Sequence, residues 1–320
     1  MRGTPENAFT LGDYVLTEHL GGGTFGTAYR VRKLNDPQNQ ADRVFKIIRP
    51  YWMKTPTWER IEASFQAERN IIEQLDHEYI VEYHGAYIRP IRAIALDTLK
   101  LTELSGTSGS EREYSQCSAN FPHGVNACDS SDSPLSIQGS LLALEIAFYK
   151  TDLRKEWISR REFSIEYAMD VGRKVVEGMA YLHEQEYIHR DLKPENIFLQ
   201  DTNDGSGHPR IGDFGIARVS VQGGTGTAGW GTDGWAPPEQ LISSATPDPT
   251  MDVYAIGQLL YWLFTSKLPF TRVSRQRAVR TNSSVQSVNN DVPDVWATII
   301  DKCRSVAVKD RYVDAGEILK

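Results

Sequence analysis

The chain has 320 residues, 40% of them hydrophobic, which is enough to bury a large core in one domain or in two lobes. A formal net charge of -7 argues against a general nucleic-acid binder, because affinity for the phosphate backbone needs a basic surface. Three cysteines without paired metal-ligand spacing indicate neither a disulfide framework nor a zinc site. The start lacks the apolar core of a signal peptide and no apolar run reaches the ~18 residues of a membrane span, so we expect a cytoplasmic protein.

β-Strands are predicted in the N-terminal part of the chain. Residues Tyr14–Arg32 and Arg43–Ile48 favour strands, and a glycine-rich stretch, LGGGTFG, divides the first of these ranges. Its glycines Gly21, Gly23 and Gly26 have the G-x-G-x-x-G spacing, which lets a backbone approach a phosphate closely but more often marks a plain turn between strands. No helix follows at once, so a dinucleotide-binding strand, turn and helix unit is not predicted.

A helix and two further strands follow, together with a segment of different composition. Residues Trp58–Leu75 carry apolar side chains at helical spacing, and strands are predicted at Ile80–Ile88 and Leu141–Ile146. The 44 residues from Asp97 to Ser140 contain ten serines, and such a composition cannot bury enough apolar surface to offset its ordering entropy. We interpret this segment as a mobile insert, more readily a tolerated surface insertion than a docking or regulatory loop.

The chain beyond Phe148 is predicted to be helical. In Glu166–Glu184 apolar residues recur every three or four positions, which is typical of a helix that packs one face into a core. Asp252–Thr265 is strongly apolar and indicates a central buried helix. Further helices are predicted at Val295–Arg304 and Val313–Leu319.

The densest group of polar residues lies in YIHRDLKPENIFL, residues 187–199. Its chemistry suits phosphoryl transfer, because Asp191 can accept a hydroxyl proton, Lys193 can offset phosphate charge and Asn196 offers an amide oxygen to a metal ion. Further along, the motif IGDFGIAR adds Asp213 as a second oxygen ligand for the metal. Each residue alone could be a capping or turn residue, but the set in this order favours a catalytic site.

The motifs HRDLKPEN and DFG together resemble those of the eukaryotic-type (Hanks-type) serine/threonine protein kinase catalytic domain. Apart from the insert, the resemblance extends from about Asp13 to Lys320. It implies an α+β, bilobal protein-kinase-like fold. Residues 1–147 would form a small β-rich N-lobe with one main helix and the flexible insert 97–140, and residues 148–320 a larger helical C-lobe.

The same resemblance implies a set of catalytic and metal-binding residues. The catalytic residues would be Asp191, Lys193, Lys46 and Glu68, and the ligands of Mg²⁺ would be Asn196 and Asp213. Asp191 matches the catalytic base, and Lys193 the lysine that contacts the transferred phosphate. Lys46 matches the strand lysine that binds the ATP phosphates, and Glu68 the glutamate that pairs with this lysine.

A further implied set binds the nucleotide. The glycine-rich loop would cover the ATP phosphates, the hinge 144–147 would hydrogen-bond adenine through its backbone, and Phe198 would lie beneath the ring. The residues predicted in this way are Gly21, Gly22, Gly23, Thr24, Phe25, Gly26, Ala28, Val44, Lys46, Leu144, Glu145, Ala147 and Phe198. Ala28 and Val44 exchange the volumes usual in the family, which would preserve the space around adenine.

Other matches imply architectural roles. Glu239 would pair with Arg311 in a buried brace, and Asp252 would hold the backbone of the loop that carries the base. His189 would be a packed core histidine. Asp152 has two interpretations that stay open, a contact to ribose or substrate and a helix N-cap.

The implied function is a signalling enzyme that transfers the ATP γ-phosphate to serine and threonine hydroxyls of proteins and also autophosphorylates, with ATP and Mg²⁺ as cofactors. Its partners would be a protein substrate and a regulatory partner at the insert 97–140, with no nucleic acid and no membrane span. Because Arg190 beside the base can pair with a phosphate, the activation segment offers Thr227, then Thr225 and Ser220, as phosphorylation candidates.

Two alternatives remain open. The first is a catalytically weak kinase-like scaffold that binds nucleotide, and the second is a small-molecule phosphotransferase. The scaffold ranks lower because the strand lysine Lys46, the base Asp191 and the metal aspartate Asp213 are all present. The phosphotransferase ranks lower because it would not need the brace between Glu239 and Arg311.

Overall fold

The computed structural model describes residues 10–11, 14–22, 26–33, 43–48, 69, 72–90, 140–201, 207–213, 232, 234–241, 246–274, 277–280 and 283–320. The chain divides into two compact units, of which the first comprises Met1–Glu59 and His84–Phe148 and the second Arg60–Tyr83 and Tyr149–Lys320. The second unit thus includes residues 60–83, which the sequence assigns to the N-lobe. The lobe boundaries themselves stay a prediction.

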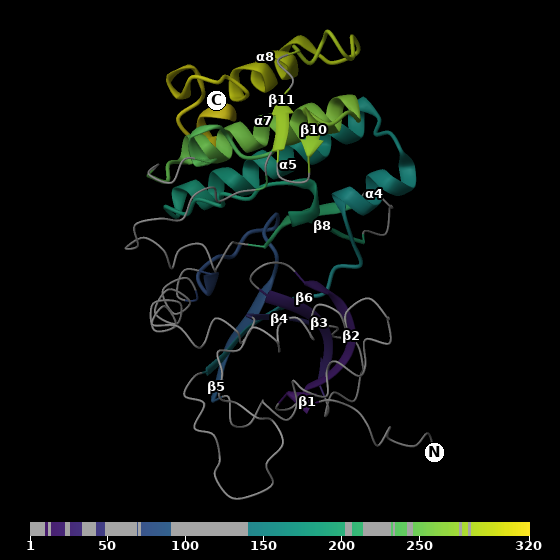
Figure 1. Cartoon of the computed structure of the whole chain (residues 1–320), viewed down its shortest axis with the longest axis vertical. Coiled ribbons are helices and arrows are strands. Elements are labelled where there is room, and N and C mark those ends of the chain that lie inside the picture. Colours follow the sequence, from purple (N-terminus) through teal and green to yellow (C-terminus); the bar gives the residue numbers. More distant parts are fainter. Residues whose placement is uncertain are drawn as a thin grey trace, which may run out of the picture. The chain divides into compact units, whose positions relative to one another are not determined.

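The first unit contains a six-stranded sheet with the order β1-β2-β3-β4-β6-β5 (Figure 1). Its strands are β1 (Thr10–Leu11), β2 (Tyr14–Gly22), β3 (Gly26–Lys33), β4 (Arg43–Ile48), β5 (Tyr83–Pro90) and β6 (Ser140–Ala147). The pairs from β1 through β4 to β6 are antiparallel. Except for β1, these strands lie within a few residues of the ranges that the sequence predicts.

The glycine-rich stretch connects β2 to β3. β2 ends at Gly22 and β3 begins at Gly26, and the two strands pair antiparallel, so the predicted hairpin is confirmed. Gly21 has φ +141°, a conformation that side chains rarely adopt, and it follows a shift in strand register after His19. A glycine is therefore required here by the backbone of the hairpin alone.

One face of this sheet covers a small apolar core. Strand residues alternate between the two faces, so Phe45 and Ile47 point to the same side as their partner Ala143 on β6. With Leu16 and Val31 they form one buried cluster. The intervening residues of β4 and β6 therefore belong to the opposite face.

The second unit is mainly helical. Its helices are α4 (Leu153–Arg160), α5 (Ile165–Glu184), α7 (Pro249–Thr265), α8 (Asp294–Cys303) and α9 (Ala315–Ile318), with the short 3-10 helices η3 (Pro194–Asn196), η4 (Glu239–Leu241) and η5 (Val308–Asp310). Helix α5 begins after Ser164 and α7 after Asp248, and each of these side chains accepts a hydrogen bond from a backbone N–H in the first turn. All four helices predicted beyond Phe148 are present, although α9 is shorter than expected.

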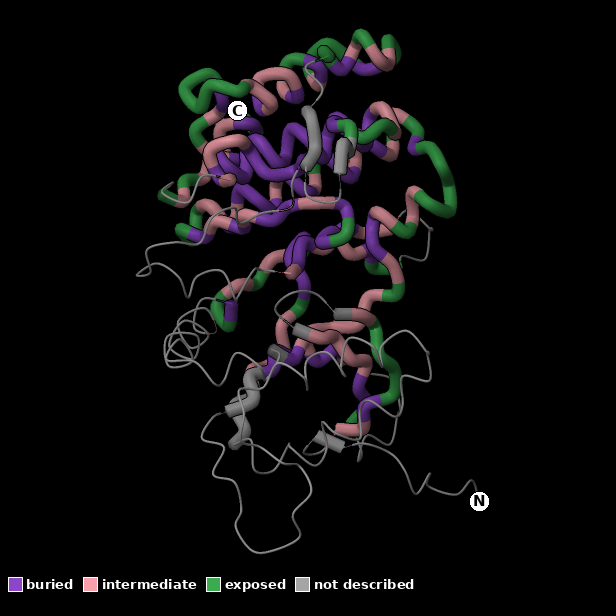
Figure 2. The backbone as a smooth tube through the Cα atoms, viewed as in Figure 1, coloured by how far each residue is buried: buried purple, intermediate pink, exposed green. Residues whose placement is uncertain are grey.

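Helix α7 lies at the centre of this unit. Every residue from Met251 to Phe264 is buried, which Figure 2 shows as an almost continuous purple tube. It packs against α5 and α8. A helix that is apolar on all sides is stable only when it is covered on all sides, so the prediction of a central buried helix is confirmed.

Several short strands of the second unit were not predicted. β7 (Thr151–Asp152), β8 (Ile197–Gln200) and β9 (His208–Ile211) form one small sheet, and β10 (Phe270–Ser274) and β11 (Arg277–Arg280) form another. They have two to five residues each. Runs this short carry no periodicity that can be read, and long-range pairing decides their conformation.

The predicted helix Trp58–Leu75 lies largely outside the described residues. Arg69 and Ile72 are helical, and the carbonyl of Arg69 accepts a hydrogen bond of 2.9 Å from Glu73, as in a last helical turn. The C-terminal end of this helix is therefore the part that lies among the described residues.

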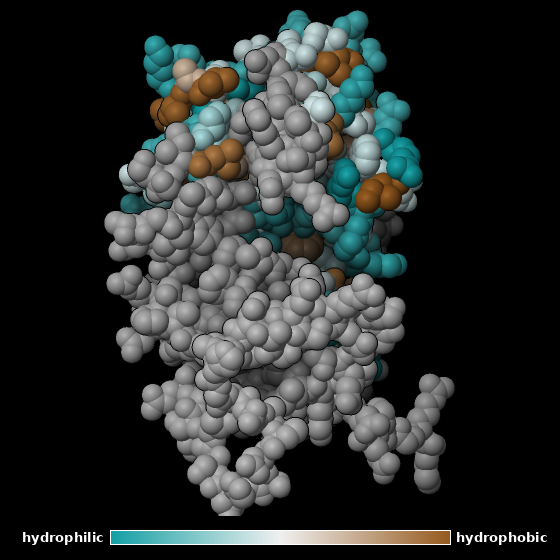
Figure 3. Space-filling view, in the orientation of Figure 1, coloured by the Kyte–Doolittle hydropathy of each residue, from teal (hydrophilic) through white to brown (hydrophobic). Residues whose placement is uncertain are grey.

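The visible surface of the second unit is predominantly polar. In Figure 3 its apolar residues appear as separate brown spots on a teal and white background, a pattern usual for proteins in water. Within the part of the chain that the structure describes, no helix combines the length and apolar character needed to cross a membrane.

Candidate active site

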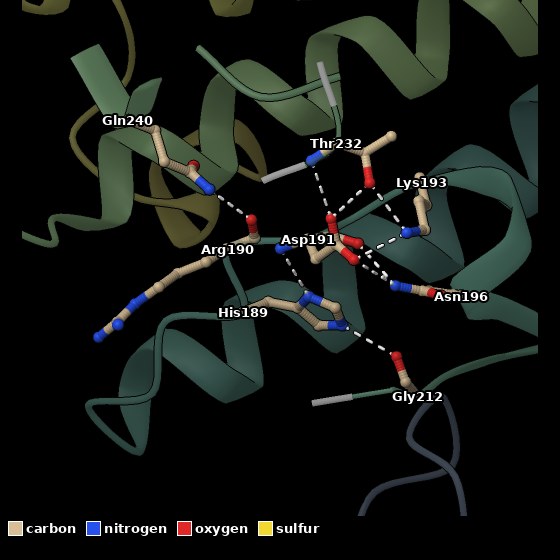
Figure 4. A network of polar contacts seen from close by, with 8 residues as sticks. All are labelled: His189, Arg190, Asp191, Lys193, Asn196, Gly212, Thr232 and Gln240. Carbon is tan, nitrogen blue, oxygen red and sulfur yellow. Dashed lines mark hydrogen bonds and ion pairs between the residues drawn. The ribbon is translucent and has the colours of Figure 1, made fainter. Parts of the chain in front are cut away.

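The HRD segment, residues 189–196, joins helix α5 to strand β8 and holds the carboxylate of Asp191 in a polar network (Figure 4). Oδ2 of Asp191 accepts a hydrogen bond from the ammonium of Lys193 at 2.8 Å. Oδ1 accepts one from the hydroxyl of Thr232 at 2.8 Å and another from the Thr232 backbone N–H at 3.2 Å. Lys193 also donates to the Thr232 hydroxyl at 2.9 Å, so the three side chains form a closed triangle.

Asn196 lies on the other side of Asp191 and is almost fully buried. Its amide nitrogen donates to the backbone carbonyl of Asp191 at 2.8 Å, which leaves the amide oxygen pointing away from that bond. Its own carbonyl accepts a hydrogen bond of 3.0 Å from Gly212, the residue before Asp213. The fold thus brings the backbones of the two predicted metal ligands, Asn196 and Asp213, close together.

His189 has a structural place in this network. Its Nδ1 accepts a hydrogen bond of 3.3 Å from the Asp191 N–H, so Nε2 carries the proton that is donated to the Gly212 carbonyl at 3.0 Å. The ring is 1% exposed and ties the HRD segment to the strand before Asp213. The prediction of a packed core histidine is confirmed.

Asp252 of α7 holds the backbone of the HRD segment. Its Oδ2 accepts a hydrogen bond from the His189 N–H and its Oδ1 one from the Arg190 N–H, both at 2.7 Å and across more than sixty residues of sequence. Complete burial alone would raise the pKa of Asp252, but the hydrogen bonds that its carboxylate accepts from His183 and from the Arg190 N–H lower it. The predicted anchoring role of Asp252 is confirmed.

His183 completes this anchor and was not predicted. Its Nδ1 accepts a hydrogen bond of 3.0 Å from the Ala315 N–H at the start of α9, so its Nε2 must donate to Asp252 Oδ2 at 3.2 Å. In the sequence, His183 is one polar residue near the end of a helix, and no local pattern distinguishes it from a solvated one.

Two residues of the site have strained backbone. Arg190 has φ 65° and Asp213 has φ 59°, both in the left-handed region that residues other than glycine avoid. At Arg190 the N–H is bound by Asp252, and the carbonyl accepts a hydrogen bond of 2.6 Å from the side chain of Gln240. Such strain persists where the surroundings over-determine the backbone, and it gathers at functional sites.

Thr232 and Gln240 were also missed as members of the site. Both lie in the stretch GTDGWAPPEQ, residues 231–240. Their contacts reach residues 41 and 50 positions earlier in the chain. Only the folded chain brings them to Asp191 and Arg190.

In the first unit, strand register decides which predicted nucleotide residues share a face. Ala28 lies opposite Lys46, and Lys46 opposite Leu144, so these three side chains point to one side of the sheet. Val44, two residues before Lys46, is on the same side. This is the face opposite the apolar core.

Glu145 and Ala147 point to the core side instead. The carboxylate of Glu145 accepts a hydrogen bond of 2.8 Å from the Tyr14 hydroxyl and lies 3.6 Å from Arg43 Nε. With Glu145 only 3% exposed, its side chain serves the sheet. The hinge role that the sequence suggests for these two residues uses their backbone and does not need their side chains, and it stays a prediction.

The comparisons with known proteins agree with this geometry. A family model described as the protein kinase domain matches residues 14–319. The chain belongs to the protein kinase family. The predicted resemblance to a Hanks-type serine/threonine kinase catalytic domain is thereby confirmed, over nearly the range expected from the motifs.

Curated relatives are serine/threonine kinases of distant organisms. The serine/threonine-protein kinase PknL of Mycobacterium tuberculosis is 31% identical over 51% of this chain and 41% of its own length. The eIF-2-alpha kinase GCN2 of Arabidopsis thaliana is 24% identical over 97% of this chain and 25% of its own length. The chain therefore spans less than half the length of these relatives.

Solved structures show the same fold at low identity. The kinase domain of Mycobacterium tuberculosis PknI, as a double mutant, has a TM-score of 0.60 at 15% identity and covers 99% of this chain and 96% of its own. Rad53 1-466 in complex with AMP-PNP has a TM-score of 0.63 at 18% identity, covering 96% and 64%. The predicted bilobal α+β protein-kinase fold is confirmed.

The kinase domain also contains the predicted brace. Arg311 is 4% exposed, and its two terminal nitrogens contact the two carboxylate oxygens of Glu239, the second at 3.2 Å. Its other three N–H groups donate to the carbonyls of Ser305, Thr250 and Val306. All five donors of the guanidinium are therefore used, as a buried arginine requires.

Asp152 and Phe198 meet on strands β7 and β8, where they pair with each other. Asp152 is the N-cap of α4, because its Oδ1 accepts a hydrogen bond of 2.9 Å from the Lys155 N–H. Of the two interpretations of Asp152, the structure therefore shows the N-cap. The Phe198 ring stacks on Tyr149 with centroids 5.8 Å apart, and it limits the space beside Gly212, where an added Cβ would lie 2.9 Å from it.

Several predicted residues lie outside the described part of the chain. These are Gly23, Thr24, Phe25 and Glu68 of the nucleotide and catalytic sets, Ser220, Thr225 and Thr227 of the activation segment, and residues 97–139 of the insert. Gly22 and Gly26 are described as strand ends. The roles of all these residues stay predictions.

The described residues fit the magnesium ion that the kinase family implies. Mg²⁺ prefers oxygen ligands, and the amide oxygen of Asn196 and the carboxylate of Asp213 are of that kind. No group of three or more His, Cys, Asp or Glu side chains able to hold a metal occurs among the described residues. A kinase-type ion does not need one, since phosphate oxygens and water complete its coordination.

Proposed function

We propose that this domain is an active serine/threonine protein kinase that transfers the ATP γ-phosphate to protein hydroxyls. The observation that carries the proposal is the hydrogen bond of 2.8 Å from the Thr232 hydroxyl to Asp191 Oδ1. A hydroxyl group already donates to this carboxylate at the distance that proton abstraction requires. Asp191 would act as the general base for an acceptor hydroxyl.

Lys193 would bind the transferred phosphate next to the base Asp191. Its ammonium is fixed by Asp191 Oδ2 and by Thr232, and a single flexible cation bound at two points has little rotational freedom left. Because phosphoryl transfer depends mainly on positioning and charge stabilisation, a fixed ammonium beside the base contributes both.

Asn196 and Asp213 would hold Mg²⁺, which would supply positive charge to neutralise the phosphates of ATP. The Asn196 amide is oriented by its bond to the Asp191 carbonyl, so its oxygen needs no reorganisation to bind a cation. The strained backbone of Asp213 supports a site in which the direction of its carboxylate matters.

Ala28, Val44, Lys46 and Leu144 would form the nucleotide face of the β3–β4–β6 sheet, with Lys46 on the ATP phosphates. Their shared orientation follows from the observed register and supports the proposal. Glu68, the predicted partner of Lys46, and the loop residues Gly23, Thr24 and Phe25 belong to the same proposal.

The test is intact mass after incubation with Mg²⁺ and ATP, comparing the wild type with Asp213→Asn, followed by peptide mapping of any added phosphate. Added phosphate in the wild type alone, on serine or threonine, is the expected result. Thr227, then Thr225 and Ser220, are the sites we expect to be modified.

The opposite result would favour a nucleotide-binding scaffold. No added mass, together with calorimetric binding of ATP and no transfer to casein or myelin basic protein, would overturn the proposed activity. We also propose a cytoplasmic location, a protein substrate and a regulatory partner at the insert 97–140. Pull-down with and without this insert would test the partner.

A further inference from the structure

A buried amide lies within the apolar helix α7. Gln258 is 1% exposed, and its Nε2 donates to the carbonyl of Gly234 at 2.8 Å. Its Oε1 accepts from Arg304 Nε at 2.9 Å. Because a carbonyl can only accept and a guanidinium can only donate, the orientation of this amide is unambiguous.

Arg304 is held as firmly as the amide that it binds. Its side chain is 8% exposed, its Nη1 donates to the Ser283 carbonyl at 2.9 Å, and its guanidinium lies over the Tyr261 ring, 4.0 Å from the centroid. A Cβ at Gly257 would lie 2.8 Å from Arg304 Cγ, so α7 and the end of α8 approach closely here. The position of Arg304 is therefore determined by α7, through Gln258 and Tyr261, and by the carbonyl of Ser283.

The bond to Gly234 connects this pair to the active site. The carbonyl of Thr232 accepts hydrogen bonds from the N–H groups of Trp235 at 3.0 Å and Ala236 at 3.1 Å, so Gly234 lies within a tight turn. Gly234 has φ +95°, and an added Cβ would lie 2.5 Å from the Phe270 ring. The same turn begins at Thr232, which contacts Asp191 and Lys193.

The turn is thus fixed at both ends by buried polar groups. One end is bound to the candidate base, and the other to an amide and a guanidinium that touch neither that base nor the metal ligands. Burying an amide and an arginine in an otherwise apolar helix interface costs free energy unless every polar group is paired. Apolar side chains in their place would stabilise the interface equally well. The arrangement therefore calls for a reason beyond stability.

We propose that Gln258 and Arg304 are positioning residues that set the turn 232–236 against Asp191 and so control binding of the acceptor protein. This proposal rests on the proposed kinase activity. Loss of the bond to the Gly234 carbonyl would let the turn shift away from Asp191. The acceptor would then bind more weakly while the nucleotide would bind as before.

The test uses three variants of the whole chain. Gln258→Leu removes the bond to the Gly234 carbonyl and leaves Arg304 with a buried donor unpaired. Gln258→Leu with Arg304→Met replaces the whole pair by apolar side chains, which restores stability without restoring the bond. Gln200→Leu is the matched control, because Gln200 binds Arg210 in the same way on strands β8 and β9 at 2.6 and 3.0 Å.

Steady-state kinetics with myelin basic protein as the acceptor separates the two roles. We expect the single and the double variant to raise the acceptor KM about fivefold to tenfold, as for one lost hydrogen bond, with the KM for ATP unchanged. The control should match the wild type. If the double variant regains both the wild-type melting temperature and the wild-type acceptor KM, Gln258 and Arg304 are merely structural and the proposal fails.

Amide hydrogen exchange keeps the inference testable apart from activity. Peptides covering residues 232–241 should exchange faster in both Gln258 variants and at the wild-type rate in the control. Unchanged exchange in the double variant would overturn the positioning role of Gln258 and Arg304 even if the wild type is an active kinase. An inactive wild type would overturn the proposed function. Faster exchange in the Gln258 variants would then still support the positioning role of Gln258 and Arg304.

Discussion

Asp191 lies in a loop whose backbone is held by side chains from distant parts of the chain, whereas Lys46 lies in a strand held by its two neighbouring strands. Around Asp191, hydrogen bonds come from residues as far as 63 positions away. Around Lys46, the pairs with Ala28 and Leu144 determine which way the side chain points. One half of the proposed catalytic set is thus positioned by individual polar contacts, and the other half by strand register alone.

The sharpest separation of chemistry from scaffold comes from Asp191→Asn. The backbone of the HRD segment stays bound to Asp252 and Gln240, so the free energy of unfolding should change by no more than about 1 kcal/mol. Loss of the base should lower phosphate transfer to myelin basic protein about a thousandfold. Asp170→Asn, on the exposed side of α5, is the control, and a loss of less than tenfold at Asp191 would contradict its role as base.

The distant anchor is tested by Asp252→Asn. An amide has one acceptor oxygen for three donors, so at least one buried N–H of His189, Arg190 or His183 loses its partner. We expect urea unfolding to show a loss of about 2 to 4 kcal/mol, with a reduced transfer rate. Asp248→Asn keeps the N-cap of the same helix and should lie within about 0.5 kcal/mol of the wild type.

The strand side of the comparison is tested by Lys46→Met. The substitution leaves the backbone pairing of β4 with β3 and β6 intact, so the free energy of unfolding should be nearly unchanged. The rate of phosphate transfer should fall about a hundredfold because the contact to the ATP phosphates is lost. Lys33→Met, at the exposed end of β3, provides the control. A large drop in melting temperature at Lys46 would instead make it a structural residue of the sheet.

The brace should respond to a change of shape at constant charge. Arg311→Lys keeps one cation but cannot make the five hydrogen bonds of the guanidinium, so we expect a loss of about 2 kcal/mol in unfolding free energy. Lys309→Arg, an exposed neighbour, should have little effect. Equal stability of Arg311→Lys and the wild type would show that charge alone is sufficient.

The smallest effect concerns a polar group outside both regions. Burial raises the pKa of Tyr167 from 10.0 to about 12, and its hydroxyl has no hydrogen-bond partner among the described residues. Because this pKa is raised, the contribution of Tyr167 to folding stability is fully present below pH 10 and is lost as pH rises toward 12. Tyr167→Phe should have the same free energy of unfolding as the wild type at pH 7. As pH rises from 10 to 12, its free energy of unfolding should fall by about 1 to 2 kcal/mol less than that of the wild type. Parallel stability curves for the two proteins would refute this.

Much of the fold was predictable because its signals are local. The apolar repeat of α5, the uniformly apolar α7 and the glycine hairpin of β2 and β3 each depend on residues within one element. The pairing of Glu239 with Arg311 was predicted from family motifs, and the structure confirms it. The short strands β7 to β11 were missed because two to five residues carry no readable period.

The sequence by itself determined the residues on which the proposed chemistry depends: a carboxylate, a lysine, two predicted oxygen ligands for a metal and a strand lysine, in the order of a protein kinase. Only the tertiary structure decided that Thr232 joins Asp191, that His183 supports Asp252, and that Gln258 and Arg304 bind the turn beside them. The physical reason is that a hydrogen bond depends on distances of a few tenths of an ångström between groups that lie far apart along the chain. Helix packing sets these distances, and no local pattern records them.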